Sequence, residues 1–74
     1  MRLTEVEKGI RVRLLGVDGD EATAGKLARY GLFPGDLARI VQVAPLDGPL
    51  LVESGGRQIA LGRQVAGKIL VEPA

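Results

Sequence analysis

The chain has 74 residues, 46% of them hydrophobic, which suits one small domain with a modest core. It contains no cysteine and no histidine, so disulfides, thiolate metal sites, thiol catalysis and histidine-based acid–base chemistry are excluded. Its formal net charge is +1, from 10 basic and 9 acidic residues, so the overall charge does not favour nucleic acid or anionic lipid as a partner.

The N-terminal residues predict a short turn followed by a strand. Thr4 and Glu7 have the spacing of a capping box, and Lys8-Gly9 is expected to end that turn. From Ile10 to about Val17, apolar and polar residues alternate, which is typical of a half-buried strand. We therefore expect the first strand to follow directly on one helical turn.

The next segment predicts a helix over residues 21–30. Asp20 is a suitable N-cap for it, since a short side-chain acceptor can bind the free amides of a first helical turn. Lys26 and Arg29 lie in the expected last turn, where positive charge complements the helix dipole.

One face of this helix is narrow and apolar. Ala24, Leu27 and Ala28 fall on that face at helical spacing, and we expect them to pack onto a sheet. Gly31 can take the left-handed conformation that closes a helix, and Pro34 fixes φ in the turn that follows.

Four further strands are expected after this turn, at residues 36–43, Leu50–Ser54, Arg57–Leu61 and 68–72. Residues 45–49 contain two prolines and predict a loop. Gly55-Gly56 suits the positive φ values of a type I′ hairpin turn. Arg63–Ala66 predicts a single helical turn before the last strand, in which Ile69 and Val71 share one face.

Five short strands with one inserted helix cannot bury a flat sheet efficiently in so short a chain. Curling into a barrel covers the core and removes the sheet edges. We therefore predict a mainly β fold, a small SH3-like five-stranded barrel, as one domain over residues 1–74. The α-helix is inserted after the first strand, and a short helical turn precedes the last strand.

The only two aromatic residues, Tyr30 and Phe33, flank the predicted helix end at Gly31. Aromatic side chains on exposed turns often anchor interfaces, so both are candidate partner-binding residues. The alternative, given equal weight, is that Tyr30 closes the helix against the barrel while Phe33 covers the mouth of the core.

Leucines surround the proline-bounded loop. Leu46, Leu50 and Leu51 stand there, and at least one must be exposed because successive strand residues point to opposite faces. Leu46 and Leu50 are taken as partner-binding candidates, although single surface leucines are common and need no function.

Two arginines are the remaining candidates for partner binding. Arg29 and Arg63 can contact a phosphate or an acidic partner surface, and an arginine offered to a GTPase can stabilise charge in its transition state. An exposed arginine is more often simply solvated.

Carboxylates are the only available hard-cation ligands, because the chain has no histidine or cysteine. Asp18, Asp20, Glu21 and Asp47 lack the spacing of a calcium loop and are better explained as turn and cap residues. The sequence contains no Walker A, GxGxxG, GxSxG or HExxH motif. The sequence therefore predicts no enzyme, no metal site and no cofactor.

Three separated motifs occur in order: KLARYGLFPG at 26–35, VAPLDGPL at 43–50, and Ile59-Ala60-Leu61 followed by Ala66 and the apolar 69–71. Together they resemble the FeoA family of small SH3-like barrels associated with bacterial ferrous-iron uptake. The resemblance implies a non-enzymatic adaptor that docks on the cytoplasmic region of FeoB, the Fe(II) permease with a GTP-binding domain. It implies a cytoplasmic protein, at the inner membrane only through that partner; the charged first eight residues agree, since they offer no apolar run for a signal peptide.

Two other functions remain open. Small SH3-like barrels also bind RNA, and a phosphate track could be lined by Arg11, Arg13, Arg39 and Arg57. The balanced charge and the lack of an aromatic platform speak against nucleic acid. The chain could also be a stand-alone relative of the barrel domain of DtxR-type metalloregulators, but it has no helix-turn-helix segment.

Overall fold

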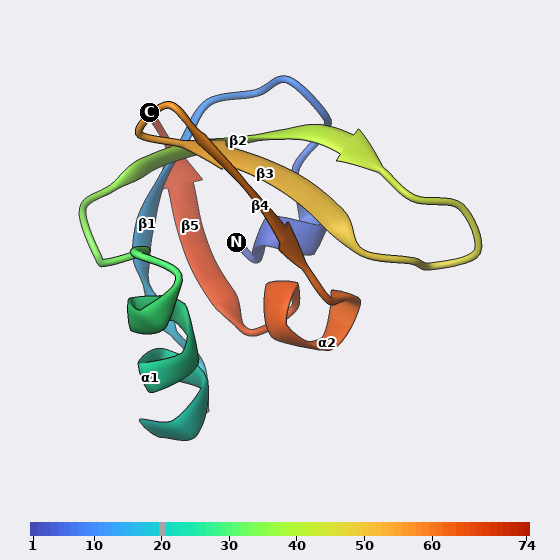
Figure 1. Ribbon diagram of the computed structural model, residues 1–74. Helices are drawn as coiled ribbons and strands as arrows, with labels where there is room; N and C mark the ends of the chain where they lie inside the picture. The colour runs from blue at the N-terminus through green and yellow to red at the C-terminus, as the bar shows by residue number, and fades with distance from the viewer. Residues whose placement is uncertain (20) are drawn as a thin grey trace.

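The computed structural model describes residues 1–19 and 21–74. In that part of the chain, one antiparallel sheet has the strand order β4-β3-β2-β1-β5 (Figure 1). The strands are β1 (Val12–Val17), β2 (Leu37–Val43), β3 (Leu50–Ser54), β4 (Arg57–Leu61) and β5 (Ile69–Pro73). The helical elements are the 3₁₀ turn η1 (Leu3–Glu5), α1 (Glu21–Arg29) and α2 (Arg63–Ala66).

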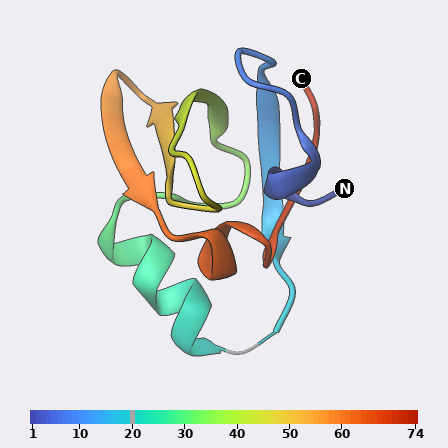
Figure 2. The same cartoon turned by 90° about the vertical axis from the view of Figure 1, so that its right-hand side faces the viewer.

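The sheet curls because its middle is bent. Irregularities in register fall between Leu14 and Gly16 in β1 and between Ile40 and Gln42 in β2, and such bulges bend a strand and increase its twist. The β1–β2 pairing itself is short and covers only Val12 with Ala38 and Arg13 with Leu37. The two halves of the sheet, β3–β4 and β1–β5, consequently face each other (Figure 2).

The predicted mainly β, barrel-like architecture is confirmed, but the sheet does not close. Among the described residues, β4 pairs only with β3, so its outer edge remains free. The outer edge of β5 is partly covered by an isolated bridge between Arg2 and Leu70. Curling is thus sufficient to enclose the core without strand pairing all the way round.

The core lies between the two halves of the curled sheet. Alternation puts every second strand residue inside, as in β3, where Leu50, Val52 and Ser54 are buried. The largest side chains with less than 2% exposure are Leu3, Val12, Ile40, Leu50, Val52, Leu61, Ile69 and Val71. They come from η1 and from all five strands, so the first and last parts of the chain share one core.

The N-terminal segment is fastened to β5. The Val71 amide donates to the Met1 carbonyl at 2.8 Å, and the Met1 amino group donates to the Val71 carbonyl at 3.1 Å. The expected turn exists as η1, but the Thr4 capping box is wrong. The backbone amide of Arg2 donates to the Glu5 carboxylate at 2.6 Å, so the acidic cap acts two residues earlier.

Helix α1 buries a narrower stripe than the sequence predicts. Thr23 and Leu27 are its buried residues, whereas Ala24 and Ala28 are exposed. The helix packs beside one end of the sheet (Figure 1), so only the line through positions 23 and 27 is covered. The Asp20 cap lies outside the described residues.

The other elements follow the sequence closely. The β3–β4 turn has φ of +60° at Gly55 and +78° at Gly56, as a type I′ turn requires. The predicted ranges of β3 and β4 are confirmed, whereas the predicted first, second and last strands begin one or two residues too early. Pro73 lies within β5, paired with Val12, instead of ending it.

Candidate partner-binding surfaces

The C-terminus of α1 turns the chain back onto the sheet. The Gly31 amide donates to the Ala28 carbonyl at 2.9 Å, and the Leu32 amide donates to the Leu27 carbonyl at 3.0 Å. With φ of +82° at Gly31, this is a Schellman motif, whose usual apolar contact is supplied here by the buried Leu27 and Leu32. The predicted role of Gly31 as the helix end is confirmed. Phe33, which follows the buried Leu32, is exposed at the surface.

An apolar groove of about 250 Å³ lies between α1 and the neighbouring part of the sheet. Its buried lining includes Leu14, Leu27, Leu32 and Ile69. Its exposed lining consists of Ala24, Ala28, Phe33 and Pro34. The two alanines that do not pack onto the sheet therefore form one wall of this groove.

Phe33 is held in place without being covered. Its amide donates to the Asp36 carboxylate at 2.9 Å, and the Asp36 amide donates back to the Phe33 carbonyl at 3.1 Å. The side chain nevertheless remains 52% exposed. A fixed backbone and a half-exposed ring at the lip of a groove are what a preformed apolar contact needs.

Arg29 and Tyr30 adjoin this groove in sequence but do not line it. Arg29 is exposed in the last turn of α1, and Tyr30 is 37% exposed. The backbone carbonyl of Tyr30 accepts a hydrogen bond from the Arg57 guanidinium at 3.0 Å. Position 30 thus has a structural role through its backbone that the sequence did not reveal.

The loop at residues 44–49 carries the most exposed apolar side chain of the described residues. Leu46 is 99% exposed, and both Leu46 and Asp47 adopt left-handed φ values, +58° and +56°. Two backbone hydrogen bonds within the loop hold its conformation. The Ala44 amide donates to the Pro49 carbonyl and the Gly48 amide donates to the Pro45 carbonyl, each at 3.1 Å. The loop therefore presents Leu46 in a defined backbone conformation.

The side chain of Leu50 is buried. It is 1% exposed and packs in the core, so its assignment as a partner-binding residue is wrong. The cause is strand alternation, because β3 begins at Leu50 with its side chain inward and leaves Leu51 half-buried.

The predicted site residues do not form one continuous surface. Figure 1 shows the β2–β3 loop and α1 at opposite ends of the molecule, so Leu46 and Phe33 lie on separate surfaces. Arg63 begins α2 and joins neither of them. It is half-buried, and its Nε is a buried atom without a hydrogen-bond partner among the described residues.

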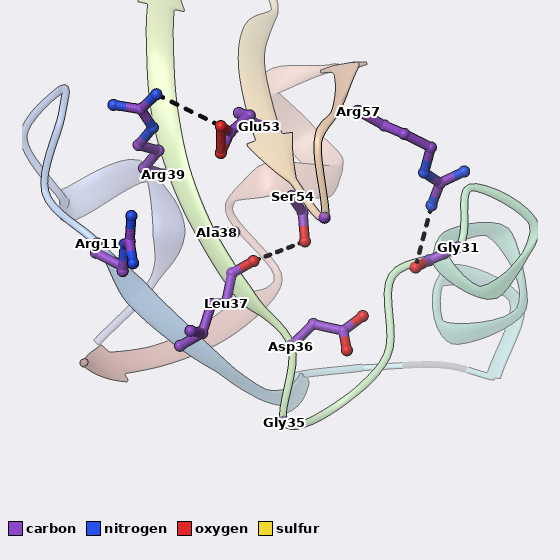
Figure 3. Close-up of a pocket in the computed structure, with 11 residues that line it drawn as sticks. Arg11, Gly31, Gly35, Asp36, Leu37, Ala38, Arg39, Glu53, Ser54 and Arg57 are labelled. Carbon is purple, nitrogen blue, oxygen red and sulfur yellow. Dashed lines mark hydrogen bonds and ion pairs between the residues drawn. The ribbon is translucent and has the colours of Figure 1, made fainter.

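A second, polar groove of about 540 Å³ lies where β2 separates from the β3–β4 hairpin (Figure 3). Three arginines of the phosphate track considered above, Arg11, Arg39 and Arg57, line it. Arg13 does not, because it is directed to the Gly35 carbonyl at 3.4 Å and to Glu72 at 3.9 Å. Sequence reasoning named these arginines, but only the fold separates three of them from the fourth.

The described residues contain neither a metal-ligand cluster nor a membrane-spanning helix. No group of three or more Asp, Glu, His or Cys side chains comes together in residues 1–19 and 21–74. None of the helices in that part of the chain is long and apolar enough to cross a bilayer.

A short antiparallel sheet curled around one core defines a small SH3-like domain. Its surface carries an apolar groove, a polar groove and the exposed loop at residues 44–49. The sequence profile of the FeoA domain matches residues 1–73. The chain therefore belongs to the FeoA family.

Solved structures agree with this assignment. Iron(II) transport protein A from Clostridium thermocellum is 34% identical with a TM-score of 0.90; the match covers 99% of this chain and 45% of that one. The zinc complex of Stenotrophomonas maltophilia FeoA, an SH3-domain protein suggested to be a ferrous iron transport activating factor, is 28% identical with a TM-score of 0.80, covering 97% and 89%.

The same fold occurs in a metalloregulator. A manganese-dependent transcriptional repressor has a TM-score of 0.90 at 17% identity, and the match covers all of this chain but 41% of the repressor. At that identity the likeness shows the fold alone. No curated protein matches the chain.

Proposed function

We propose that this chain is a non-enzymatic accessory protein of bacterial ferrous-iron uptake that binds the cytoplasmic region of a FeoB-type permease with a GTP-binding domain. The observation that carries the proposal is the FeoA-domain match over residues 1–73. In this account the chain works in the cytoplasm and reaches the membrane only through the permease.

The apolar groove supports docking at the α1 end. Its Phe33 is already about half buried, so covering it by a partner side chain would gain roughly half of the about 1.5–3 kcal/mol that full burial of an exposed ring contributes. Because the Phe33–Asp36 turn is already hydrogen-bonded, little backbone entropy is lost on binding. Arg29 and Tyr30, exposed beside the groove in sequence, are suited to polar contacts at the rim of such an interface.

Leu46 supports a second contact at the other end of the molecule. A leucine that is 99% exposed on a defined loop has no structural use in the isolated chain. Two separate contacts would let one small adaptor bridge two parts of a large partner. Arg63 belongs to neither of these two contacts, and its role in partner binding remains a separate proposal.

The test is a binding titration of the full chain against the purified, detergent-solubilised FeoB-type permease of the same host. Phe33→Ser is compared with Leu15→Ser, a matched control because Leu15 is 48% exposed and does not line the apolar groove. We expect Phe33→Ser to weaken binding about tenfold or more, as loss of an interface anchor does, with the thermal transition unchanged. Leu15→Ser is expected to bind as the wild type does.

Three results would contradict the proposal in different ways. Absence of binding by the wild type removes the permease as partner. Binding that survives both Phe33→Ser and Leu46→Ser removes the two apolar contacts. A parallel loss of thermal stability in Phe33→Ser, but not in Leu15→Ser, shows that Phe33 serves the core instead.

A further inference from the structure

The polar groove exists because the sheet forks. β2 pairs with β3 from Arg39 onward, opposite Glu53, while the β3–β4 hairpin continues to Ser54 opposite Arg57. At the fork, the Ser54 hydroxyl donates to the Leu37 carbonyl at 2.6 Å and holds the two branches at a fixed separation. The groove is therefore part of the architecture and does not depend on a mobile side chain.

The charged side chains that line the polar groove differ in how many hydrogen-bond partners they have. Each of the two carboxylates accepts one hydrogen bond: Asp36 from the Phe33 amide at 2.9 Å, and Glu53 from Arg39 at 3.4 Å. Nothing among the described residues is paired with the Arg11 side chain. Arg57 uses Nη2 on backbone carbonyls and keeps its other donors free. The groove thus offers unused guanidinium donors on Arg11 and Arg57, and its three arginines outnumber its two carboxylates.

The positive groups stand on two sides. Figure 3 shows Arg11 and Arg39 on one side of the groove and Arg57 on the other, with Asp36 near the middle. Leu37 is 40% exposed and supplies an apolar surface within the same groove. A matching ligand has separated negative groups with an uncharged or apolar residue between them.

We propose that this polar groove binds an extended acidic peptide segment. Carboxylate side chains would pair with Arg11 and Arg39 at one end and with Arg57 at the other, since planar guanidinium groups bind carboxylates through two parallel hydrogen bonds. An apolar side chain between them would cover Leu37. Alternate residues of an extended peptide point the same way, so the two carboxylates and the apolar residue between them would occupy positions i, i+4 and i+2 of the segment.

A nucleic-acid strand matches this groove less well. No residue that lines the groove is aromatic, so bases find no stacking platform there. The proposal is independent of docking on a permease, because it concerns a different groove and can be tested on the isolated chain.

The probe is a short fluorescent peptide that contains Glu-Ser-Leu-Ser-Glu, in which Glu, Leu and Glu share one face of the extended chain, titrated into the full-length chain at low and at physiological salt. A peptide with Gln in place of Glu reports contributions other than charge. The variants are Arg11→Gln and Arg39→Gln, with Arg13→Gln as matched control. Arg13 is an exposed arginine two positions from Arg11 that does not itself line the groove, and its loss changes the net charge equally.

We expect saturable binding of the Glu peptide that is about tenfold weaker in Arg11→Gln and in Arg39→Gln, each corresponding to about 1.4 kcal/mol. Arg13→Gln and Phe33→Ser should retain the wild-type affinity. NMR amide shifts should centre on Ala38, Ser54 and Gly55, which line the groove. The Gln peptide should bind much more weakly.

Several outcomes overturn the proposal. Equal losses in Arg13→Gln and Arg11→Gln would mean that only general charge attracts the peptide. Absence of saturable binding would show that the polar groove does not bind the peptide. Amide shifts located at the apolar groove would show that the peptide binds elsewhere. Tighter, Arg11-dependent binding of a single-stranded RNA of similar length would assign the groove to nucleic acid instead.

Discussion

The Nη2 of Arg57 lies 3.0 Å from the backbone carbonyl of Tyr30, joining two residues 27 positions apart in the chain. Carbonyl groups in the last turn of a helix have no intrahelical partner, and positive charge there is favourable. This one side chain therefore caps α1 from the β3–β4 hairpin. It also lines the polar groove, so the end of the helix and the groove share a residue.

Removing this cap is expected to destabilise the domain modestly. Arg57→Ala loses a partly solvated hydrogen bond to a carbonyl, worth about 1 kcal/mol in the free energy of unfolding. Urea unfolding followed by circular dichroism measures it. Gln58→Ala, at the exposed next position of β4, is the control and should change stability by less than about 0.5 kcal/mol. Equal effects of the two substitutions would show that the cap contributes nothing.

Gly31 is constrained twice. Its φ is +82°, and a Cβ at this position would collide with the Arg57 guanidinium. Gly35 has a similar φ of +96°, but nothing lies within 4 Å of its Cβ position. Gly35→Ala should lose about 1–2 kcal/mol for the left-handed backbone alone. Gly31→Ala should cost about 1 kcal/mol more, because the flexible Arg57 side chain must move aside and give up its hydrogen bond to the Tyr30 carbonyl.

A double-mutant cycle separates these two costs. In an Arg57→Ala background, the difference between Gly31→Ala and Gly35→Ala should largely vanish, because the colliding group is gone. The measured quantity is again the free energy of unfolding. If the difference persisted without Arg57, the collision would not be its cause.

The hydrogen bond from Ser54 to the Leu37 carbonyl should contribute measurably to the free energy of unfolding. Ser54 is 7% exposed, and Ser54→Ala leaves the Leu37 carbonyl without its donor, at a cost of about 1–2 kcal/mol. Amide hydrogen exchange in the part of β2 next to the fork should also accelerate. Ala60→Ser, a hydroxyl change at an exposed strand position, is expected to be nearly neutral. Comparable unfolding curves for both variants would refute a structural role for this bond.

Leu46 in the β2–β3 loop and Leu50 at the start of β3 should differ in how much their truncation lowers the free energy of unfolding. Leu50→Ala opens a cavity in the core and should cost about 2–5 kcal/mol, whereas the gentler Leu50→Val should cost about 1 kcal/mol. Leu46→Ala removes a side chain that is 99% exposed and should leave the unfolding transition within about 0.5 kcal/mol. A large loss of stability in Leu46→Ala would mean that the loop packs against the domain.

The fold was predictable where local chemistry and the required backbone agree. The Gly55-Gly56 turn, the Gly31 helix end and the shared face of Ile69 and Val71 all follow from residue type and spacing. Leu50 was misplaced because alternation fixes which residues share a face but not which face is inside. Only the pairing of β3 with its neighbours settles that point.

The candidate surfaces were less predictable because they depend on contacts between distant segments. The sequence names Phe33 and Leu46 as exposed apolar residues, but their separation to opposite ends of the molecule is a property of the folded chain (Figure 1). Likewise, Arg13 and Arg11 look equivalent in sequence. They differ because the Gly35 carbonyl and Glu72 lie near Arg13, while Arg11 faces the groove.

The pairing of Met1 with Val71 has a consequence for how the chain folds. The segments at positions 1 and 71 exchange two backbone hydrogen bonds, and β1 completes its pairing on β5. During synthesis, β1 can pair with β2 but lacks its more extensive pairing until β5 has been made. The nascent chain therefore holds apolar β1 residues such as Val12 and Leu14 without their final cover, and closing so long a loop makes folding slow for a domain of this size.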